Sequence, residues 1–375
     1  MRDYDIAIIG AGIMGAAAAC EAARDGAKVA LIDQSSLPNP QAASVDHSKV
    51  FRFAYPDPLY ARMAVDALSR WRSLEELTGA HLLTPTGLLT VGKSENSIED
   101  ETYNALRSLD LEAELLDSRE VAARFPQFNR DAFPYAVYDP SGAILHAETA
   151  VRASIDLARQ RNVTIIEGER ITRIKQAANG RVSLVGESGR RSDCARVAVA
   201  SGPWTRKLLS FLDDKLTTTR QEVAYFEPVS SRPGFDVGRF PIFIEMDSGF
   251  YGFPIHHSGA MKIANHHKGE RVEPYSFETQ VTDDFIGGCR AFFSEFIPAL
   301  SGAQVRETRV CLYNNTPDDD FIIDWHPEVE NVLIVTGFSG HGFKFGPTIG
   351  RISADLLSSG HTPFDIERFG LSRFR

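Results

Sequence analysis

Two glycine-rich segments carry the residue types that can bind an anionic cofactor. The first reads Gly10-Ala11-Gly12-Ile13-Met14-Gly15, and Asp33 follows 18 residues after Gly15. Glycine permits a sharp turn and a close approach of the backbone to a pyrophosphate, and the amides that open the next helix point toward the anion. The Asp33 carboxylate can accept hydrogen bonds from ribose hydroxyls. This spacing predicts a dinucleotide site, and it does not separate FAD from NAD.

The second segment, Gly337 to Gly346, combines glycines with aromatic and cationic residues. It follows an apolar run and precedes a helical pattern, so its backbone amides can face a negative charge. Such a loop would stabilise the negative charge that a reduced flavin carries around N1 and the C2 carbonyl. The alternative is an ordinary glycine-rich connection, but a lysine among aromatic residues is a poor loop filler. The candidate residues are Gly340, His341, Gly342 and Lys344.

Apolar patterning predicts the elements that position these segments. Short apolar runs bounded by glycines indicate buried parallel strands, and apolar residues at helical spacing indicate helices. The expected strands are Ile6–Ile9, Lys28–Asp33, Val163–Ile166, Val197–Ala200 and Val332–Thr336, and the expected helices are Ala16–Arg24, Ala147–Arg161 and Ile349–Leu357. Asn179-Gly180 predicts a hairpin between Ile171–Ile174 and Val182–Val185. From Val223 to Asn265 the pattern becomes aromatic and β-rich, with strands expected at Phe240–Glu245 and Phe250–Phe253.

Composition narrows the class of protein. The chain has 375 residues, which favours two domains, and its formal net charge of −10 argues against nucleic acid or an anionic membrane as a partner. Its four cysteines (Cys20, Cys194, Cys289 and Cys311) are scattered without a C-x-x-C pair, so we expect reduced thiols and no metal site. No apolar run is long enough for a membrane span, and the chain enters its first strand almost at once. We therefore expect a cytoplasmic protein.

Three motifs together resemble the monomeric sarcosine oxidase group of the D-amino-acid oxidase superfamily. They are the N-terminal glycine motif, Asp320-Phe-Ile-Ile-Asp-Trp-His-Pro327, and the Gly337–Phe345 segment, with Thr84–Leu89 and Ser201–Trp204 at similar positions. The resemblance runs over the whole length. It implies an α/β (α+β) two-domain fold of the glutathione-reductase/D-amino-acid-oxidase type. The Rossmann-like FAD-binding domain would comprise residues 1–85, 147–218 and 319–375, and the β-sheet-rich substrate domain residues 86–146 and 219–318.

The resemblance also assigns roles around the flavin. Cys311 matches the thiolate that is joined to the flavin 8α-methyl, although a lone cysteine is usually a buried free thiol. Lys262 matches the lysine poised for reaction with oxygen, where a fixed ammonium would stabilise developing superoxide. By itself a strand lysine more often reaches toward solvent. The remaining cofactor contacts that we expect are Ser48, Lys49, Ile171, Gly202 and Trp204.

On the substrate side, Arg52 and Lys344 match the pair that holds the substrate carboxylate. His266 lies on the same face of the strand pattern as Lys262 and would line the substrate pocket. Tyr251 or His266 could tune the reactivity of the substrate amine. Lys49 stands where sarcosine oxidase carries an arginine that faces the flavin. A lysine there resembles the fructosyl-amine and saccharopine oxidase branch, which puts sarcosine itself in doubt.

The implied function is an FAD-dependent oxidase of a small secondary amine that bears a carboxylate, either an N-alkyl amino acid such as sarcosine or a fructosyl- or opine-type amino acid. Its products would be an imine, which water hydrolyses, and hydrogen peroxide. The expected partners are the amine and molecular oxygen, and the expected assembly is a monomer. Three alternatives stay open: a flavin dehydrogenase with another electron acceptor, an NAD-dependent dehydrogenase, and a flavin-binding subunit that turns over poorly alone.

Overall fold

An eight-stranded sheet built from distant parts of the chain forms one half of the molecule. The computed structural model describes residues 2–92, 97–228 and 232–374. The strand order is β10-β11-β12-β1-β2-β9, and β19 lies beside the second half of β12 and carries β18 on its other side. The strands are β1 (Arg2–Ile9), β2 (Val29–Ile32), β9 (Thr164–Ile166), β10 (Ile171–Gln176), β11 (Val182–Gly186), β12 (Arg191–Val199), β18 (Ile322–Trp325) and β19 (Val332–Thr336).

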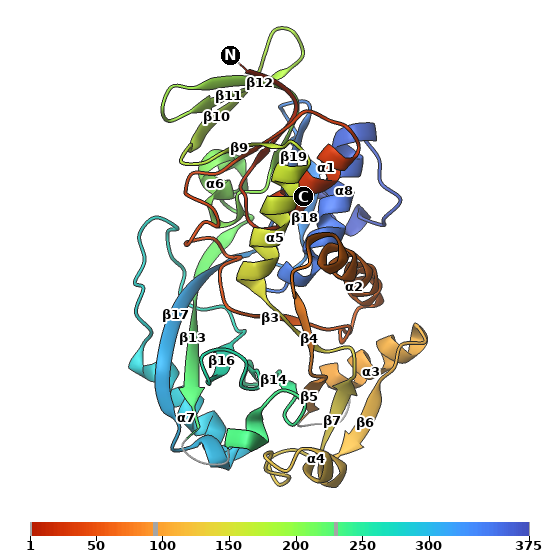
Figure 1. The fold of residues 1–375 in the computed structure, drawn as a ribbon, viewed down its shortest axis with the longest axis vertical. Coiled ribbons are helices and arrows are strands. Elements are labelled where there is room, and N and C mark those ends of the chain that lie inside the picture. The colour runs from red at the N-terminus through yellow and green to blue at the C-terminus, as the bar shows by residue number, and fades with distance from the viewer. Residues whose placement is uncertain (1, 93–96, 229–231, 375) are drawn as a thin grey trace.

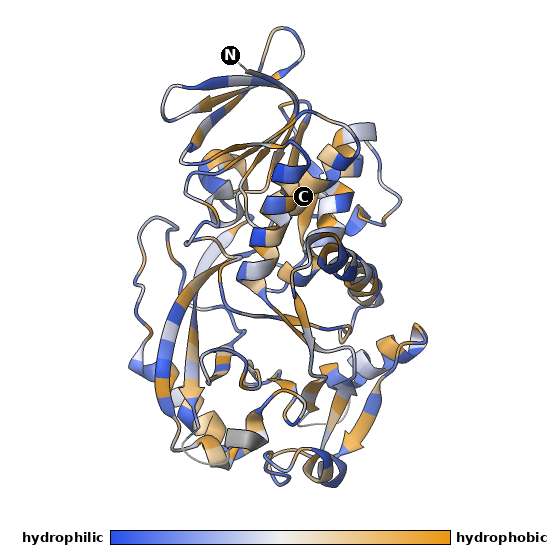
Figure 2. Ribbon diagram, viewed as in Figure 1, coloured by the Kyte–Doolittle hydropathy of each residue, from blue (hydrophilic) through white to orange (hydrophobic). Residues whose placement is uncertain are grey.

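The parallel centre and the hairpin of this sheet match the sequence patterns. β1 runs parallel to β2 and β12, and β12 runs parallel to β19. β10 and β11 pair antiparallel on either side of Asn179-Gly180, which confirms the predicted hairpin. β12 is longer than the predicted Val197–Ala200, because its first half also forms a strand, paired parallel with β1 on one side and antiparallel with β11 on the other. Figure 2 shows apolar residues concentrated on the central strands.

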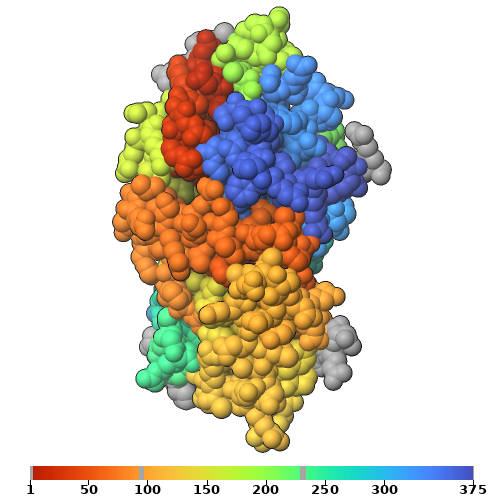
Figure 3. All heavy atoms as spheres, turned by 90° about the vertical axis from the view of Figure 1, so that its right-hand side faces the viewer, coloured from red at the N-terminus to blue at the C-terminus, as the bar shows by residue number. Residues whose placement is uncertain are grey.

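Helices from the N-terminal, middle and C-terminal parts of the chain pack together, and the first and last of them contact the strands of this sheet. They are α1 (Ile13–Arg24), α2 (Pro58–Thr78), α5 (Ala147–Gln160) and α8 (Gly346–Ser359). α1 packs against α8 and α5, and small residues allow the first contact, since a Cβ at Gly350 would lie 2.6 Å from the Cβ of Ala17. α1 begins at Ile13 and not at the predicted Ala16, because Gly12 is already its N-cap. In Figure 3 the N-terminal (red) and C-terminal (blue) parts of the chain therefore lie together in the upper part of the molecule.

The other half contains a second eight-stranded sheet with the order β17-β13-β16-β15-β14-β5-β7-β6. Its strands are β5 (Leu88–Gly92), β6 (Glu114–Asp117), β7 (Tyr135–Asp139), β13 (Thr217–Glu227), β14 (Ile242–Glu245), β15 (Phe250–Gly252), β16 (Met261–Asn265) and β17 (Gln304–Asn315). Its helices are α3 (Ile98–Ser108), α4 (Ser118–Arg124) and α7 (Asp283–Phe296). β13 and β17 pair along eleven residues of β13 and form the long ribbon at the left of Figure 1. An aromatic core lies under this sheet, with Phe243 stacked on Phe292.

A small third sheet lies between the two halves (Figure 1). It has the order β3-β8-β4, with β3 (Lys49–Phe51), β4 (Leu83–Pro85) and β8 (Ala143–Leu145). The short helix α6 (Thr205–Leu208) and single helical turns complete the fold. The turns are η1 (Gly202–Trp204), η2 (Ser210–Leu212), η3 (Arg232–Phe235), η4 (Pro298–Leu300), η5 (Phe343–Phe345), η6 (Glu367–Phe369) and η7 (Leu371–Phe374).

The two large sheets take their strands from different segments of the chain. The first sheet draws its strands from residues 2–32, 164–199 and 322–336, and the second from residues 88–139 and 217–315. The domain boundaries stay a prediction, and their ranges include residues 93–96 and 229–231, which lie outside the described part of the chain. None of the described helices is both long and apolar enough to cross a membrane.

Candidate active site

A cavity of about 270 Å³ opens where β1, β2, β12 and β19 end, and most of the predicted cofactor residues line it. The predicted residues that line it are Gly10, Gly12, Ile13, Met14, Asp33, Lys49, Ile171, Gly202, Trp204, Gly340 and Gly342. Five others lie outside its lining: Gly15, Ser48, Cys311, His341 and Lys344. Parallel sheets bind ligands outside the carboxyl ends of their strands, so this is the expected place for a dinucleotide.

Backbone crowding explains the glycines of the first motif. Gly10 has φ +103°, and a Cβ there would lie 2.4 Å from the carbonyl oxygen of Ala200. A Cβ at Gly15 would lie 1.8 Å from the carbonyl oxygen of Gly10. Gly15 therefore permits the close packing of α1 on the turn and does not line the cavity.

Side chains fix the turn between β1 and α1. Asp33 is buried, and its Oδ2 accepts the Ala11 N–H at 2.8 Å while its Oδ1 accepts from Asn39 Nδ2 at 2.9 Å. Burial raises the pKa of Asp33, and these hydrogen bonds oppose that rise. Ser44 Oγ accepts the N–H of Ile13 at 3.0 Å. The sequence analysis missed Asn39 and Ser44, because the turn between β2 and β3 shows no periodic pattern.

A tyrosine from the other half of the protein also lines this cavity. Tyr275 lies in the loop between β16 and α7, and its hydroxyl donates to Gln34 Oε1 at 3.0 Å. Its ring centroid lies 6.1 Å from that of Trp204, whose indole N–H has no hydrogen-bond partner among the described residues. Figure 1 shows the loop reaching up toward α6. Glu273 fastens it there through ion pairs with Arg206 and Lys207.

Lys344 and Arg52, the two residues predicted to hold the substrate carboxylate, both contact Tyr55. Lys344 is only 4% exposed, and its Nζ donates to the Tyr55 hydroxyl at 2.8 Å and to the His341 carbonyl at 2.7 Å. The Arg52 guanidinium carbon lies 4.5 Å from the centroid of the same tyrosine ring. Burial, and then the charge of Arg52, lowers the pKa of Lys344 well below its ordinary value. Among the described residues, no carboxylate forms an ion pair with Lys344 or Arg52.

Neutral polar side chains surround these cations. Burial, and then Arg52, lowers the pKa of His266 to about 4, so its imidazole is neutral at pH 7. Burial, and then Lys344, lowers the pKa of His341 to about 3, and its ring bonds to the Tyr55 hydroxyl and the Asp319 carbonyl. His341 therefore supports Tyr55 from outside the cavity lining. The titratable neighbours of Tyr251 are instead Tyr313, Cys311 and Asp46, and burial raises its pKa well above its ordinary value.

The two other predicted lysines, Lys49 and Lys262, both contact the carboxylate of Asp46, which was not among the predicted site residues. Lys262 Nζ lies 2.5 Å from Asp46 Oδ2 and donates to the Ser48 carbonyl at 2.6 Å. Lys49 Nζ lies 3.5 Å from the same Asp46 oxygen. Ser48 thus acts through its carbonyl, and its hydroxyl meets His256 Nε2 at 2.9 Å. The only local signal for Asp46 was its place three residues before Lys49.

Cys311 faces a second cavity. This cavity, of about 230 Å³, is lined by Asp46, Arg309 and Cys311 among others. Burial raises the pKa of the Cys311 thiol, with Lys49 and Lys262 lowering it and Asp46 raising it. Cys311 therefore lies within electrostatic reach of both lysines, and its neighbour Leu312 lines both cavities.

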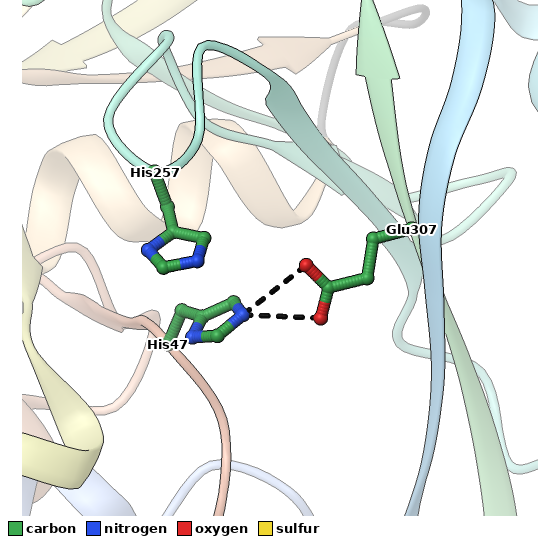
Figure 4. A group of neighbouring side chains, drawn as sticks. All are labelled: His47, His257 and Glu307. Atoms are coloured by element: carbon green, nitrogen blue, oxygen red, sulfur yellow. Dashed lines mark hydrogen bonds and ion pairs between the residues drawn. The ribbon is translucent and has the colours of Figure 1, made fainter.

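His47, His257 and Glu307 form a group whose possible ligand atoms all lie within 4.8 Å of one another (Figure 4). His47 Nε2 lies 3.1 Å from Glu307 Oε1, and the two imidazoles stack with centroids 3.5 Å apart. Arg309 Nε already donates to the same Glu307 oxygen at 2.6 Å. The charge of the Glu307 carboxylate is thus already compensated by a guanidinium. The contacts hold the segment that carries Asp46 and Lys49.

Comparisons with known proteins identify the relatives of this chain. The family model described as FAD dependent oxidoreductase matches residues 5–356. The chain is 32% identical over 379 residues to the monomeric sarcosine oxidase of Bacillus sp. (strain B-0618), across 99% of this chain and 96% of that relative. It is 30% identical over 384 residues to the N-methyl-L-tryptophan oxidase of Yersinia pestis (strain Pestoides F), across 100% of both. The solved structure of L-proline dehydrogenase from P. horikoshii has a TM-score of 0.87 at 20% identity, over 100% of this chain and 98% of that one.

Proposed function

Because the chain belongs to the FAD dependent oxidoreductase family, we propose that it oxidises a small secondary amine that bears a carboxylate, and that molecular oxygen accepts the electrons. The substrate would be an N-alkyl amino acid, such as sarcosine, or a fructosyl- or opine-type amino acid. The names of the relatives support an amino-acid substrate, since they are oxidases of sarcosine and N-methyl-L-tryptophan. We further propose that the enzyme acts as a cytoplasmic monomer.

The observation that carries this proposal is the pairing of Arg52 and Lys344 without a protein carboxylate among the described residues. A buried ammonium is costly unless an anion compensates it. Here Lys344 is held by a hydroxyl and a carbonyl, and Arg52 lies against the same Tyr55 ring. A substrate carboxylate would supply the missing charge, and the planar guanidinium can bind it through two parallel hydrogen bonds.

The residues that line the first cavity fit FAD. The crowded glycines bring the backbone of the first motif close to a pyrophosphate. The N-cap Gly12 has no side chain to cap α1, so the first-turn amides after Ile13, whose N–H donates to Ser44, can face the anion. Gly12, Asp33, Trp204 and Gly340 would hold the cofactor. When bound, FAD supplies the acceptor for a hydride equivalent from the carbon next to the amine nitrogen.

The protein's part is to hold the amine neutral and oriented. The positive charges of Arg52 and Lys344 disfavour an ammonium form of the substrate close to them. His266 is neutral at pH 7, so a ring nitrogen can accept a hydrogen bond from the amine. The amine loses two hydrogens to become an imine, water hydrolyses the imine to a carbonyl compound and an amine, and oxygen gains two electrons and two protons to become hydrogen peroxide.

Two further assignments belong to this proposal. Lys262 would stabilise the negative charge that develops on oxygen, and its fixed position between Asp46 and the Ser48 carbonyl suits that role. Cys311 would bind the flavin covalently. Its place beside Lys49 and Lys262 supports this, because these positive charges lower the pKa of the thiol against the rise that burial causes.

The test is to reduce the purified flavoprotein with candidate amines in the absence of oxygen and to record the absorbance of the flavin. N-methyl and N-fructosyl amino acids should bleach the flavin, whereas matched amines without the carboxylate, such as dimethylamine against sarcosine, should not. Lys344→Met should abolish the bleaching while the flavin content stays unchanged. Equal bleaching by amines without a carboxylate would contradict the proposal. Bleaching by amino acids without peroxide on admission of oxygen would point to a dehydrogenase with another acceptor.

A further inference from the structure

Asp46 is the centre of a buried cluster of charges. It is 2% exposed, and Lys262 is 1% exposed. Asp46 Oδ2 receives Lys262 Nζ at 2.5 Å and Lys49 Nζ at 3.5 Å. Its Oδ1 accepts the Tyr225 hydroxyl at 2.9 Å and the His47 N–H at 2.8 Å. Each carboxylate oxygen of Asp46 thus has two partners, and these contacts fix its orientation.

The cluster connects the two cavities. Lys49 lines the first cavity, and Asp46 lines the second together with Cys311. Two ammonium groups and one carboxylate give the cluster a net charge of +1 when both lysines are protonated. Without Asp46, two buried positive charges would face each other with no compensating carboxylate, which a low dielectric makes unfavourable.

We propose that Asp46 is a positioning residue for oxidation by oxygen: its carboxylate holds the Lys262 ammonium in place and keeps it protonated beside Lys49. This inference rests on the proposed function, in which Lys262 stabilises negative charge on oxygen. Oxygen takes two electrons from the reduced cofactor and two protons to become hydrogen peroxide, and Lys262 keeps its own proton throughout.

The charges around Lys262 support the inference. Burial lowers the pKa of Lys262, Asp46 raises it, and Lys49 lowers it again. Burial likewise opposes the charged form of Lys49, but Asp46, together with Cys311 and Tyr313, outweighs it and raises the pKa of Lys49 to about 12. The other titratable groups near Lys262 are Cys311 and His256, while Tyr225 contacts Asp46. Asp46 is the carboxylate among them, so its removal should release the proton of Lys262 at a lower pH.

The experiment uses the holoenzyme reduced with dithionite, so that no amine substrate is needed, and then mixed with oxygen. In Asp46→Asn the second-order rate of reoxidation should fall about tenfold or more, as expected for loss of a preorganised charge. The rate should also decline as pH rises over a range where the wild-type rate is flat. Lys262→Met should be slow at every pH, and Asp46→Asn/Lys262→Met should be no slower than Lys262→Met, because Asp46 acts through Lys262.

The matched control is Asp66→Asn in α2, which removes a carboxylate that pairs with Arg70 and lines neither cavity. It should leave reoxidation unchanged. If Asp46→Asn does not fold, Tyr225→Phe removes only the hydroxyl bonded to Asp46 and should slow reoxidation by a smaller factor. A wild-type reoxidation rate in either folded variant, or effects of Asp46→Asn and Lys262→Met that multiply, would overturn the inference.

Thermal unfolding provides a readout that does not depend on activity. Asp46→Asn and Lys262→Met should each lower the melting temperature, and the double variant should lose less than the two losses added together. Additive losses would show that the residues are not coupled and would also overturn the inference. Failure of the proposed function differs from both outcomes, because the wild-type protein would then react with oxygen slowly while the coupling in melting temperature remained.

Discussion

The indole N–H of Trp71 donates to the carbonyl oxygen of Lys344 at 2.7 Å, although the two residues are 273 positions apart. Trp71 is fully buried in α2, and its ring stacks on Phe343 in the turn that carries Lys344. The orientation of the buried ammonium therefore depends on a helix from the other end of the chain.

Trp71→Phe should destabilise the protein and weaken substrate binding together. The substitution leaves a buried carbonyl without its donor and a gap beside Phe343, for a loss of about 2–4 kcal/mol in the free energy of unfolding. Urea titration measures the loss, and KM for the amine should rise. Trp325→Phe is the matched control, because Trp325 lines neither cavity and its indole N–H makes no hydrogen bond among the described residues. An equal loss in both variants would contradict the role of the Trp71 bond.

Binding of a simple carboxylate, such as acetate, should weaken as pH rises. Lys344 must be protonated to compensate the anion, and burial places its pKa well below the ordinary value. Affinity is thus complete below this pKa and is lost above it, by about tenfold for each pH unit. Perturbation of the flavin spectrum during titration at several pH values measures the dissociation constant. Lys344→Met should bind weakly with no such dependence, and a wild-type affinity that stays level up to pH 10 would disprove the assignment.

Covalent attachment of the flavin should require Cys311. After acid denaturation and centrifugation, yellow colour should stay in the wild-type pellet and move to the supernatant for Cys311→Ser. Cys289→Ser is the control, because Cys289 is fully buried in α7 and lines neither cavity. Release of flavin from the wild-type protein would rule out the covalent bond and leave the FAD site intact.

Gly15→Ala should disrupt the cofactor site through the backbone. The new Cβ would lie 1.8 Å from the Gly10 carbonyl oxygen, so α1 and the turn must separate. We expect loss of bound FAD and a lower melting temperature. Gly287→Ala in α7 meets no atom within 4 Å and should leave FAD content unchanged, with a gain in stability of at most about 1 kcal/mol. Normal FAD content in Gly15→Ala would contradict the packing role.

Much of the nucleotide half could be predicted from short stretches of sequence. The turn from β1 to α1 depends on glycines within six residues, and the β10–β11 hairpin depends on one dipeptide, so local sterics suffice. Boundary errors occurred at the starts of α1, α8 and β12. There a cap or a neighbouring strand extended the element beyond its apolar pattern.

Only the tertiary structure decided how the charges meet. Asp46 and Lys262 are 216 positions apart, and Lys344 lies 289 positions from Tyr55. Tyr275 enters the first cavity on a loop from the second sheet. No periodicity encodes such contacts, because they arise when two sheets and the segment between them pack together and bury polar groups that must then find partners. Short sequence patterns predicted a dinucleotide fold with candidate cations, whereas packing fixed which cation has a carboxylate beside it and which has none among the described residues.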